Sequence, residues 1–134
     1  MALKIQALSG TKEKSKLNGE WIVLLNDSET AFNTEGCSIS IGKVGARPRT
    51  VTTLQAGLVL RPKELCRLIS GSSGKTSHGE PPPEEEGVRN VHLFLKGPYL
   101  ERAGLIVRLM NKQLELCRAV FDPEAPSGIL STAN

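Results

Sequence analysis

Short runs in which apolar side chains alternate with polar side chains constrain the fold of this chain more than any other sequence feature. In residues 3–8 three apolar side chains alternate with Lys4 and Gln6, and in residues 37–41 three alternate with two serines. Six further short, largely apolar or β-branched runs lie between Gly, Asn, Asp or Pro signals: residues 20–27, 49–55, 64–70, 90–96, 104–110 and 114–121. Successive side chains of a β-strand point to opposite faces, so these runs are predicted to be strands. No window of 11 or more residues has the spacing of an amphipathic helix.

The turn signals recur about every ten residues, which is typical of a β-sandwich or β-barrel. The chain has 134 residues, enough for one domain. Hydrophobic residues make up 39% and aromatic residues only 4%, so aliphatic side chains must fill the core. We therefore predict one all-β domain over residues 1–122. Residues 123–134 contain two prolines and small polar residues, and we predict that they form a disordered tail.

The run around the single tryptophan is apolar on both faces, because Ile22 and Leu24 alternate with Trp21, Val23 and Leu25. A strand in a simple sandwich buries one face and leaves the other in water. We expect the indole of Trp21 in the core between the two sheets. Ile22 and Leu24 then form the opposite face, which is either covered by loops or a contact surface for a protein partner.

The Gly-Lys-Thr sequence at residues 74–76 matches the last three residues of the phosphate-binding loop motif. Such a loop needs a further glycine where Ile69 stands. Three consecutive prolines at 81–83 also oppose the helix whose N-terminus would face a phosphate. One lysine stands against four glutamates between residues 71 and 87. We predict a flexible acidic loop over residues 71–87 and no nucleotide site.

Basic residues gather in the middle of the chain, whose net charge is +3. Between residues 43 and 67 six basic residues stand against Glu64 alone. This distribution predicts a basic face, which is either ordinary solvated charge or a contact for an anion or nucleic acid. The candidate contact residues are Lys43, Arg47, Arg49, Arg61 and Arg67. No aromatic residue lies among them, which disfavours single-stranded nucleic acid as the partner.

The sequence contains no arrangement typical of an active site or a metal site. Cys37, Cys66 and Cys117 are far apart and form no C-x-x-C pair, so we expect three buried thiols in a reducing compartment rather than a zinc site. Neither G-x-S-x-G nor H-E-x-x-H occurs. We predict no enzyme activity, cofactor, metal or small-molecule substrate. The alternative is a small cysteine-dependent hydrolase, in which one thiol would lie beside His78 or His92.

Membrane and export segments are not visible in the sequence. No run approaches the roughly 18 consecutive apolar residues of a membrane helix. The first residues lack the apolar stretch and the cleavage site of an export signal. We expect a cytoplasmic protein without a membrane span; the alternative is an export signal removed before residue 1.

Residues 18–26 read Asn-Gly-Glu-Trp-Ile-Val-Leu-Leu-Asn, and residues 32–36 lead from a phenylalanine to a glycine turn. Further along stand Leu60-Arg61-Pro62 and a strand containing Gly104, Val107 and Leu109. This order of motifs resembles the lamin-tail domain family, found at the end of nuclear lamins and in many bacterial proteins. The similarity covers roughly residues 3–122, apart from the acidic loop. Three positions depart from the family pattern: Cys37 stands for Trp, Lys63 for Gly, and Leu105 for an acidic residue.

The resemblance implies an immunoglobulin-like β-sandwich of about 8–9 short strands and no catalysis. Members of the family are interaction modules that contact proteins, DNA or membranes. We therefore predict a non-enzymatic module that binds another protein or itself, through the Ile22 and Leu24 face or through an exposed edge strand. A nucleic-acid- or anion-binding domain is the alternative, and the cysteine hydrolase is the second alternative.

Overall fold

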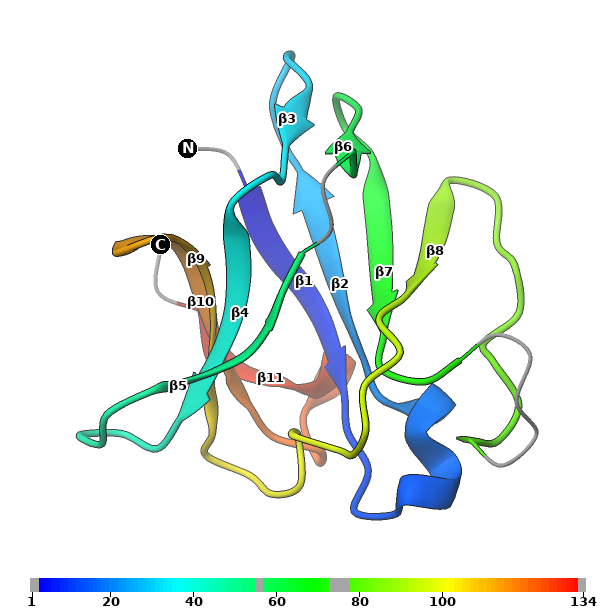
Figure 1. Ribbon diagram of the computed structural model, residues 1–134, viewed down its shortest axis with the longest axis vertical. Helices are drawn as coiled ribbons and strands as arrows, with labels where there is room; N and C mark the ends of the chain where they lie inside the picture. Colours follow the sequence, from blue (N-terminus) through cyan, green and yellow to red (C-terminus); the bar gives the residue numbers. More distant parts are fainter. Residues whose placement is uncertain (1–2, 55–56, 73–77, 133–134) are drawn as a thin grey trace.

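The computed structural model describes residues 3–54, 57–72 and 78–132, and it contains two large sheets and one small strand pair (Figure 1). The four-stranded sheet has the order β1 (Leu3–Ser9), β2 (Trp21–Asn26), β7 (Leu65–Ile69) and β8 (Val88–His92). The five-stranded sheet has the order β11 (Ile129–Thr132), β10 (Leu114–Phe121), β9 (Ile106–Asn111), β4 (Cys37–Gly42) and β5 (Arg49–Thr53). The small pair joins β3 (Phe32–Asn33) and β6 (Val59–Leu60). Two short 3-10 helices are η1 (Lys14–Gly19) and η3 (Pro126–Gly128).

The predicted all-β sandwich is confirmed, with eleven strands in the described residues where eight or nine were expected. All neighbouring strands are antiparallel except β7 and β8. Parallel neighbours need a long connection, and residues 70–87 between β7 and β8 supply it.

The core lies between the two large sheets and is mainly aliphatic, as expected from the few aromatic residues. The alternation in β4 places Cys37, Ile39 and Ile41 in this core. In β1 the pairing register shifts between Ile5 and Ala7, so Leu8 rather than Ala7 is a core residue.

The predicted orientation of β2 is wrong. Ile22 and Leu24 are each only 1% exposed and belong to the core, so they form no contact surface for a partner. Trp21 instead lies on the outer face of the four-stranded sheet, where the Arg67 guanidinium stacks on its ring at 5.1 Å. Because β2 is apolar on both faces, alternation alone could not decide which face is buried.

Ser72 and residues 78–87 of the predicted flexible loop contact the rest of the domain at several points. The Asn18 amide donates to the carbonyl oxygens of Ser72 at 3.1 Å and Gly79 at 2.9 Å. Glu85 forms an ion pair with Arg67 at 2.7 Å. The Gly-Lys-Thr residues 74–76 lie outside the described residues.

The prediction of a disordered tail is wrong for residues 126–132, which form η3 and β11. β11 pairs with β10 and extends the five-stranded sheet. The connection depends on Gly128, whose φ is +73°, and a Cβ atom there would collide with the Leu8 carbonyl oxygen. The two prolines and the glycine therefore make a tight turn rather than ending the fold.

The two sides of the sandwich differ. On one side β1 contacts β10 and β11, which closes the sandwich. On the other side the edge strands β5 and β8 are not paired with each other, and residues 93–100 run between them (Figure 1). We call this second side the open side.

Candidate functional site

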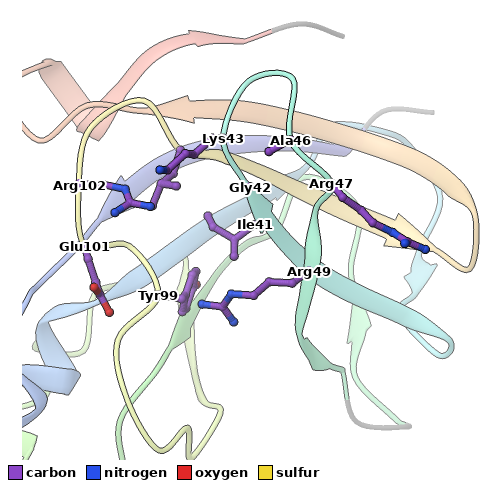
Figure 2. A pocket seen from close by; sticks show the side chains of 10 residues that line it. Ile41, Gly42, Lys43, Ala46, Arg47, Arg49, Tyr99, Glu101 and Arg102 are labelled. Atoms are coloured by element: carbon purple, nitrogen blue, oxygen red, sulfur yellow. The ribbon is translucent and has the colours of Figure 1, made fainter.

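A hollow of about 280 Å³ on the open side brings together basic side chains from two parts of the chain (Figure 2). Lys43, Arg47 and Arg49 come from the β4–β5 connection and the start of β5, and Arg102 comes from the segment before β9. We call this the basic hollow. Its other lining residues are Ile41, Gly42, Ala46, Tyr99, Glu101 and Leu105.

The β4–β5 connection sets the positions of the first three basic residues. The Ala46 N–H donates to the Lys43 carbonyl oxygen at 3.1 Å, and Gly45 next to it has a φ of +78° that glycine tolerates. Arg49 lies opposite Ile41 in the strand register, so both side chains are on the same face of the sheet. Figure 2 shows the Arg49 guanidinium pointing toward the Tyr99 ring, whereas Arg47 extends away from it.

In the part of the chain that the structure describes, the arginines of the basic hollow lack the ion pairs with glutamate that the other arginines form. Each of the others lies within 2.7 to 3.5 Å of a glutamate oxygen: Arg61, Arg67, Arg89, Arg108 and Arg118. Among the described residues, Arg47, Arg49 and Arg102 form no such pair. The basic hollow therefore holds uncompensated positive charge next to a single carboxylate, that of Glu101.

A buried carboxylate holds the backbone of Tyr99, one of the residues that line the basic hollow. Glu20 is 0% exposed, and its side chain accepts hydrogen bonds from the Tyr99 N–H at 3.0 Å, the Leu100 N–H at 2.9 Å and the Ser70 hydroxyl at 2.7 Å. Burial raises the pKa of the Glu20 carboxyl, while these hydrogen bonds act in the opposite direction. The backbone at Tyr99 is thus tied to both β2 and the end of β7.

A second hollow of about 300 Å³ adjoins the first and shares Arg49 and Tyr99 with it. Val51 of β5 lines one wall, and residues 94–98 line the other. We call this the apolar hollow after Val51, Phe94, Leu95 and Pro98; the cations Arg49 and Lys96 line it as well. The Leu95 N–H donates to the Ser70 carbonyl oxygen at 2.8 Å, which anchors this wall to the end of β7.

Phe94 is the most unusual residue of the apolar hollow. It is 59% exposed, and its φ is +56°. Left-handed backbone is rare for a bulky aromatic residue and costs energy. Strained residues of this kind gather at functional sites, and Phe94 presents a large apolar ring to solvent beside Arg49 and Val51.

β5 forms a wall of both hollows and is the last strand of its sheet. Arg49, Thr50 and Thr53 are exposed, and no described strand pairs with the outer edge of β5. An unpaired edge presents backbone N–H and C=O groups that another extended chain can use.

The structure divides the five basic residues predicted from the sequence. Arg61 pairs with Glu64 at 3.5 Å, at a third hollow of about 460 Å³ between residues 61–64 and 87–89. Arg67 is held between Trp21 and Glu85 on the outer face of the four-stranded sheet. Only Lys43, Arg47 and Arg49 lie together.

Arg102, Phe94 and Tyr99 were not predicted as site residues, because they follow β5 by more than 40 residues in the chain. The basic stretch was visible in the sequence, but its tertiary neighbours were not. A weak signal existed in Lys96-Gly97-Pro98, a turn sequence that ends the strand-like run before the domain reaches β9.

All three cysteines are buried and unpaired. Burial raises the pKa of Cys66 to about 11 and that of Cys117 to about 12, and it also raises the pKa of Cys37. A high pKa leaves little of the reactive thiolate at neutral pH. His78 Nδ1 accepts from the Ser72 N–H, and His92 Nδ1 lies 3.1 Å from the Gly71 carbonyl oxygen. The hydrolase alternative gains no support from these contacts.

The described residues contain no group of three or more His, Cys, Asp or Glu side chains placed to hold a metal ion. No helix in this part of the chain has the length and apolar character needed to cross a membrane.

A scan of the sequence against protein-family models finds no match, and a search of curated proteins finds no significant match. The resemblance to lamin-tail domains therefore stays a prediction from the motifs of the sequence.

Proposed function

We propose that this chain is a non-enzymatic interaction module that binds an extended segment of another protein on the open side of the sandwich. One observation carries the proposal: β5 has an edge that no described strand pairs with, and it forms a wall of two adjoining hollows. In β-strand addition, main-chain hydrogen bonds to the edge supply affinity, and pockets for alternate side chains supply specificity.

The dimensions of the site suit this mode of binding. Each hollow has a volume of about 280 to 300 Å³, near the lower end of the range of roughly 300–1,000 Å³ for small-molecule sites. Two small adjoining hollows along a strand accommodate the side chains of an extended chain. The lamin-tail resemblance, which implies an interaction module, supports the same reading.

A different protein is a better partner for β5 than a second copy of this chain. Pairing two β5 edges would bring Arg47 and Arg49 of both copies to one interface, where like charges repel. Ile22 and Leu24, the earlier candidates for self-association, lie in the core.

The proposal can be tested with a displayed library of short random peptides selected against the chain. Bound peptides should shift the backbone amide NMR signals of residues 49–53 and 94–99. N-methylation of alternate peptide residues should abolish binding in one register and be tolerated in the other, because only alternate N–H groups face a neighbouring strand. Recovered peptides that act only on the closed side would contradict the proposal, and so would a failure to recover any.

A second candidate function is the binding of single-stranded nucleic acid. Its supporting observation is the exposed ring of Phe94 beside Arg49, which forms no ion pair among the described residues, since such proteins combine a positive groove with aromatic platforms. Fluorescence anisotropy of a labelled oligothymidylate would test it. Binding should weaken steeply as salt rises, and the Arg47→Glu, Arg49→Glu double variant should lose it. An unchanged anisotropy at low salt excludes this function.

A further inference from the structure

We infer that the partner segment carries acidic residues, whose carboxylates enter the basic hollow while a neighbouring apolar side chain enters the apolar hollow. This inference rests on the proposed function and names the chemistry of the partner: an extended acidic peptide with apolar residues at alternate positions.

The charge of the basic hollow carries the first step. Lys43, Arg47, Arg49 and Arg102 line the hollow, the Arg47 side chain extending away from Tyr99 (Figure 2), and Glu101 is the one carboxylate among the described lining residues. Everywhere else in the chain the arginines pair with glutamates. Cations held together without partners repel one another, and a bound carboxylate relieves this repulsion. Guanidinium and carboxylate also match each other through two parallel hydrogen bonds.

The spacing along β5 carries the second step. Arg49 and Val51 both line the apolar hollow, so both side chains face it even though the pairing with β4 shifts register between Thr50 and Thr52. In a partner strand beside β5, side chains two residues apart point to one face at a separation of about 6.6 Å. An acidic residue at one such position meets Arg49, and an apolar residue at the next meets Val51 and Phe94.

The composition of the apolar hollow favours a peptide over nucleic acid. Besides the cations Arg49 and Lys96, its lining contains Val51, Leu95 and Pro98, with one exposed aromatic ring, that of Phe94. Single-strand binders stack successive bases on several aromatic side chains. The free backbone edge of β5 offers hydrogen bonds that an extended peptide can match strand to strand.

The acidic segment of a second copy is a poor occupant. Glu85 already pairs with Arg67 in its own chain. The preceding residues 81–83 are prolines, which have no N–H to donate to an edge strand. The partner is therefore expected to be a different protein.

The test uses labelled peptides of the form Ser-Glu-Ser-Val-Ser-Glu-Ser-Val-Ser, which put Glu and Val on one face of an extended chain. Two matched peptides replace Glu with Gln or with Lys, and a labelled oligothymidylate serves as the nucleic-acid probe. At low salt the Glu peptide should bind at least about tenfold more tightly than the Gln peptide, because each charged pair contributes more than a neutral hydrogen bond. The Lys peptide should bind more weakly still.

Charge reversal in the protein completes the test. The Arg47→Glu, Arg49→Glu double variant should reverse the preference and bind the Lys peptide best. A Lys12→Glu, Lys14→Glu double variant changes the net charge equally at exposed positions away from the hollow, and it should keep the wild-type preference. Thermal unfolding of all three proteins verifies that the variants fold.

The outcomes separate the inference from the proposed function. If the Glu, Gln and Lys peptides bind the β5 edge equally well, the proposed function stands and the inferred preference for acidic peptides is overturned. If none of them binds, the inference fails, and the selection from random peptides then decides whether the proposed function fails as well. An oligothymidylate that binds more tightly than the Glu peptide overturns the inference in favour of the nucleic-acid function. Self-association in sedimentation that acidic peptides reverse overturns the choice of a different protein as partner.

Discussion

Glu20 shows how a single residue connects the strand motif of the sequence to the candidate site. It stands directly before β2, is fully buried, and accepts hydrogen bonds from the N–H groups of Leu100 and of Tyr99, which lines the basic hollow. A buried carboxylate without such donors would be strongly destabilising. The segment at Tyr99 and the Glu20 side chain therefore depend on each other.

The stability of the fold should depend on pH through the ionisation of the Glu20 carboxyl. Burial raises the folded-state pKa of its carboxyl above the ordinary value of 4.5, so the folded state binds this proton more tightly than the unfolded state does. The contribution of Glu20 to stability should therefore fall as pH rises from about 4.5 through the folded-state pKa. Urea unfolding from acidic to neutral pH should show this slope in the wild type and lack it in Glu20→Gln.

The matched control for this titration is Glu35→Gln, at an exposed position, which should follow the wild-type curve. At neutral pH Glu20→Gln should also be less stable by about 1–3 kcal/mol, because a buried N–H loses its acceptor. Parallel curves for Glu20→Gln and wild type at every pH would contradict the raised pKa.

The three thiols should react slowly in the folded protein. Burial raises the pKa of Cys66 to about 11 and that of Cys117 to about 12, so thiolate is scarce at neutral pH. With a chromogenic disulfide reagent at neutral pH, all three should react fast only after denaturation. A single thiol that reacts rapidly in the native state would contradict this expectation and restore the hydrolase alternative.

At the scale of the elements, the sequence predicted the strands better than it predicted their faces. Period-two alternation identified β1 and β4 because each has one polar face. In β2 both faces are apolar, so the burial of Ile22 and the outward position of Trp21 depend on tertiary packing that alternation does not encode. β11 was missed because the two prolines and the glycine that precede it resemble a terminal tail.

The candidate site was predictable only in part for a similar reason. Lys43, Arg47 and Arg49 lie close together in the sequence and stay together in the fold. Arg61 and Arg67 belong to the same basic stretch, but the chain leaves the five-stranded sheet after β5, and β7 joins the other sheet. Arg102 belongs to a segment that is distant in the sequence, and no local sequence pattern predicts that it lies beside Lys43 and Arg49.

The turn before β11 gives a prediction at this scale. Gly128 and Gly45 both have positive φ, but a Cβ at Gly128 would strike the Leu8 carbonyl, whereas nothing lies within 4 Å of a Cβ at Gly45. Gly45→Ala should cost about 1–2 kcal/mol from backbone strain alone. Gly128→Ala should cost clearly more in thermal or urea unfolding, because the turn must also move. Equal losses for the two variants would mean that β11 contributes little to the fold.

At the scale of the whole molecule, the sandwich is closed on the side of β1 and β10 and open on the side of β5. The fold places its uncompensated arginines on the open side. It places its most exposed aromatic ring, Phe94, beside them. The distribution of charge therefore says more about binding than the net charge of +3 does. Because the arginines elsewhere are paired with glutamates, the excess positive charge lies on the open side.

Amide hydrogen exchange of the chain with and without the Glu-containing peptide tests the role of β5 most directly. If an extended acidic segment joins this edge, exchange of the outward amides of residues 49–53 should slow markedly when the peptide binds, because new interstrand hydrogen bonds protect them. The amides of β1 and β11 on the closed side should be unchanged. Unchanged exchange in residues 49–53 at saturating peptide, or protection confined to the closed side, would contradict the claim that β5 binds an extended acidic segment.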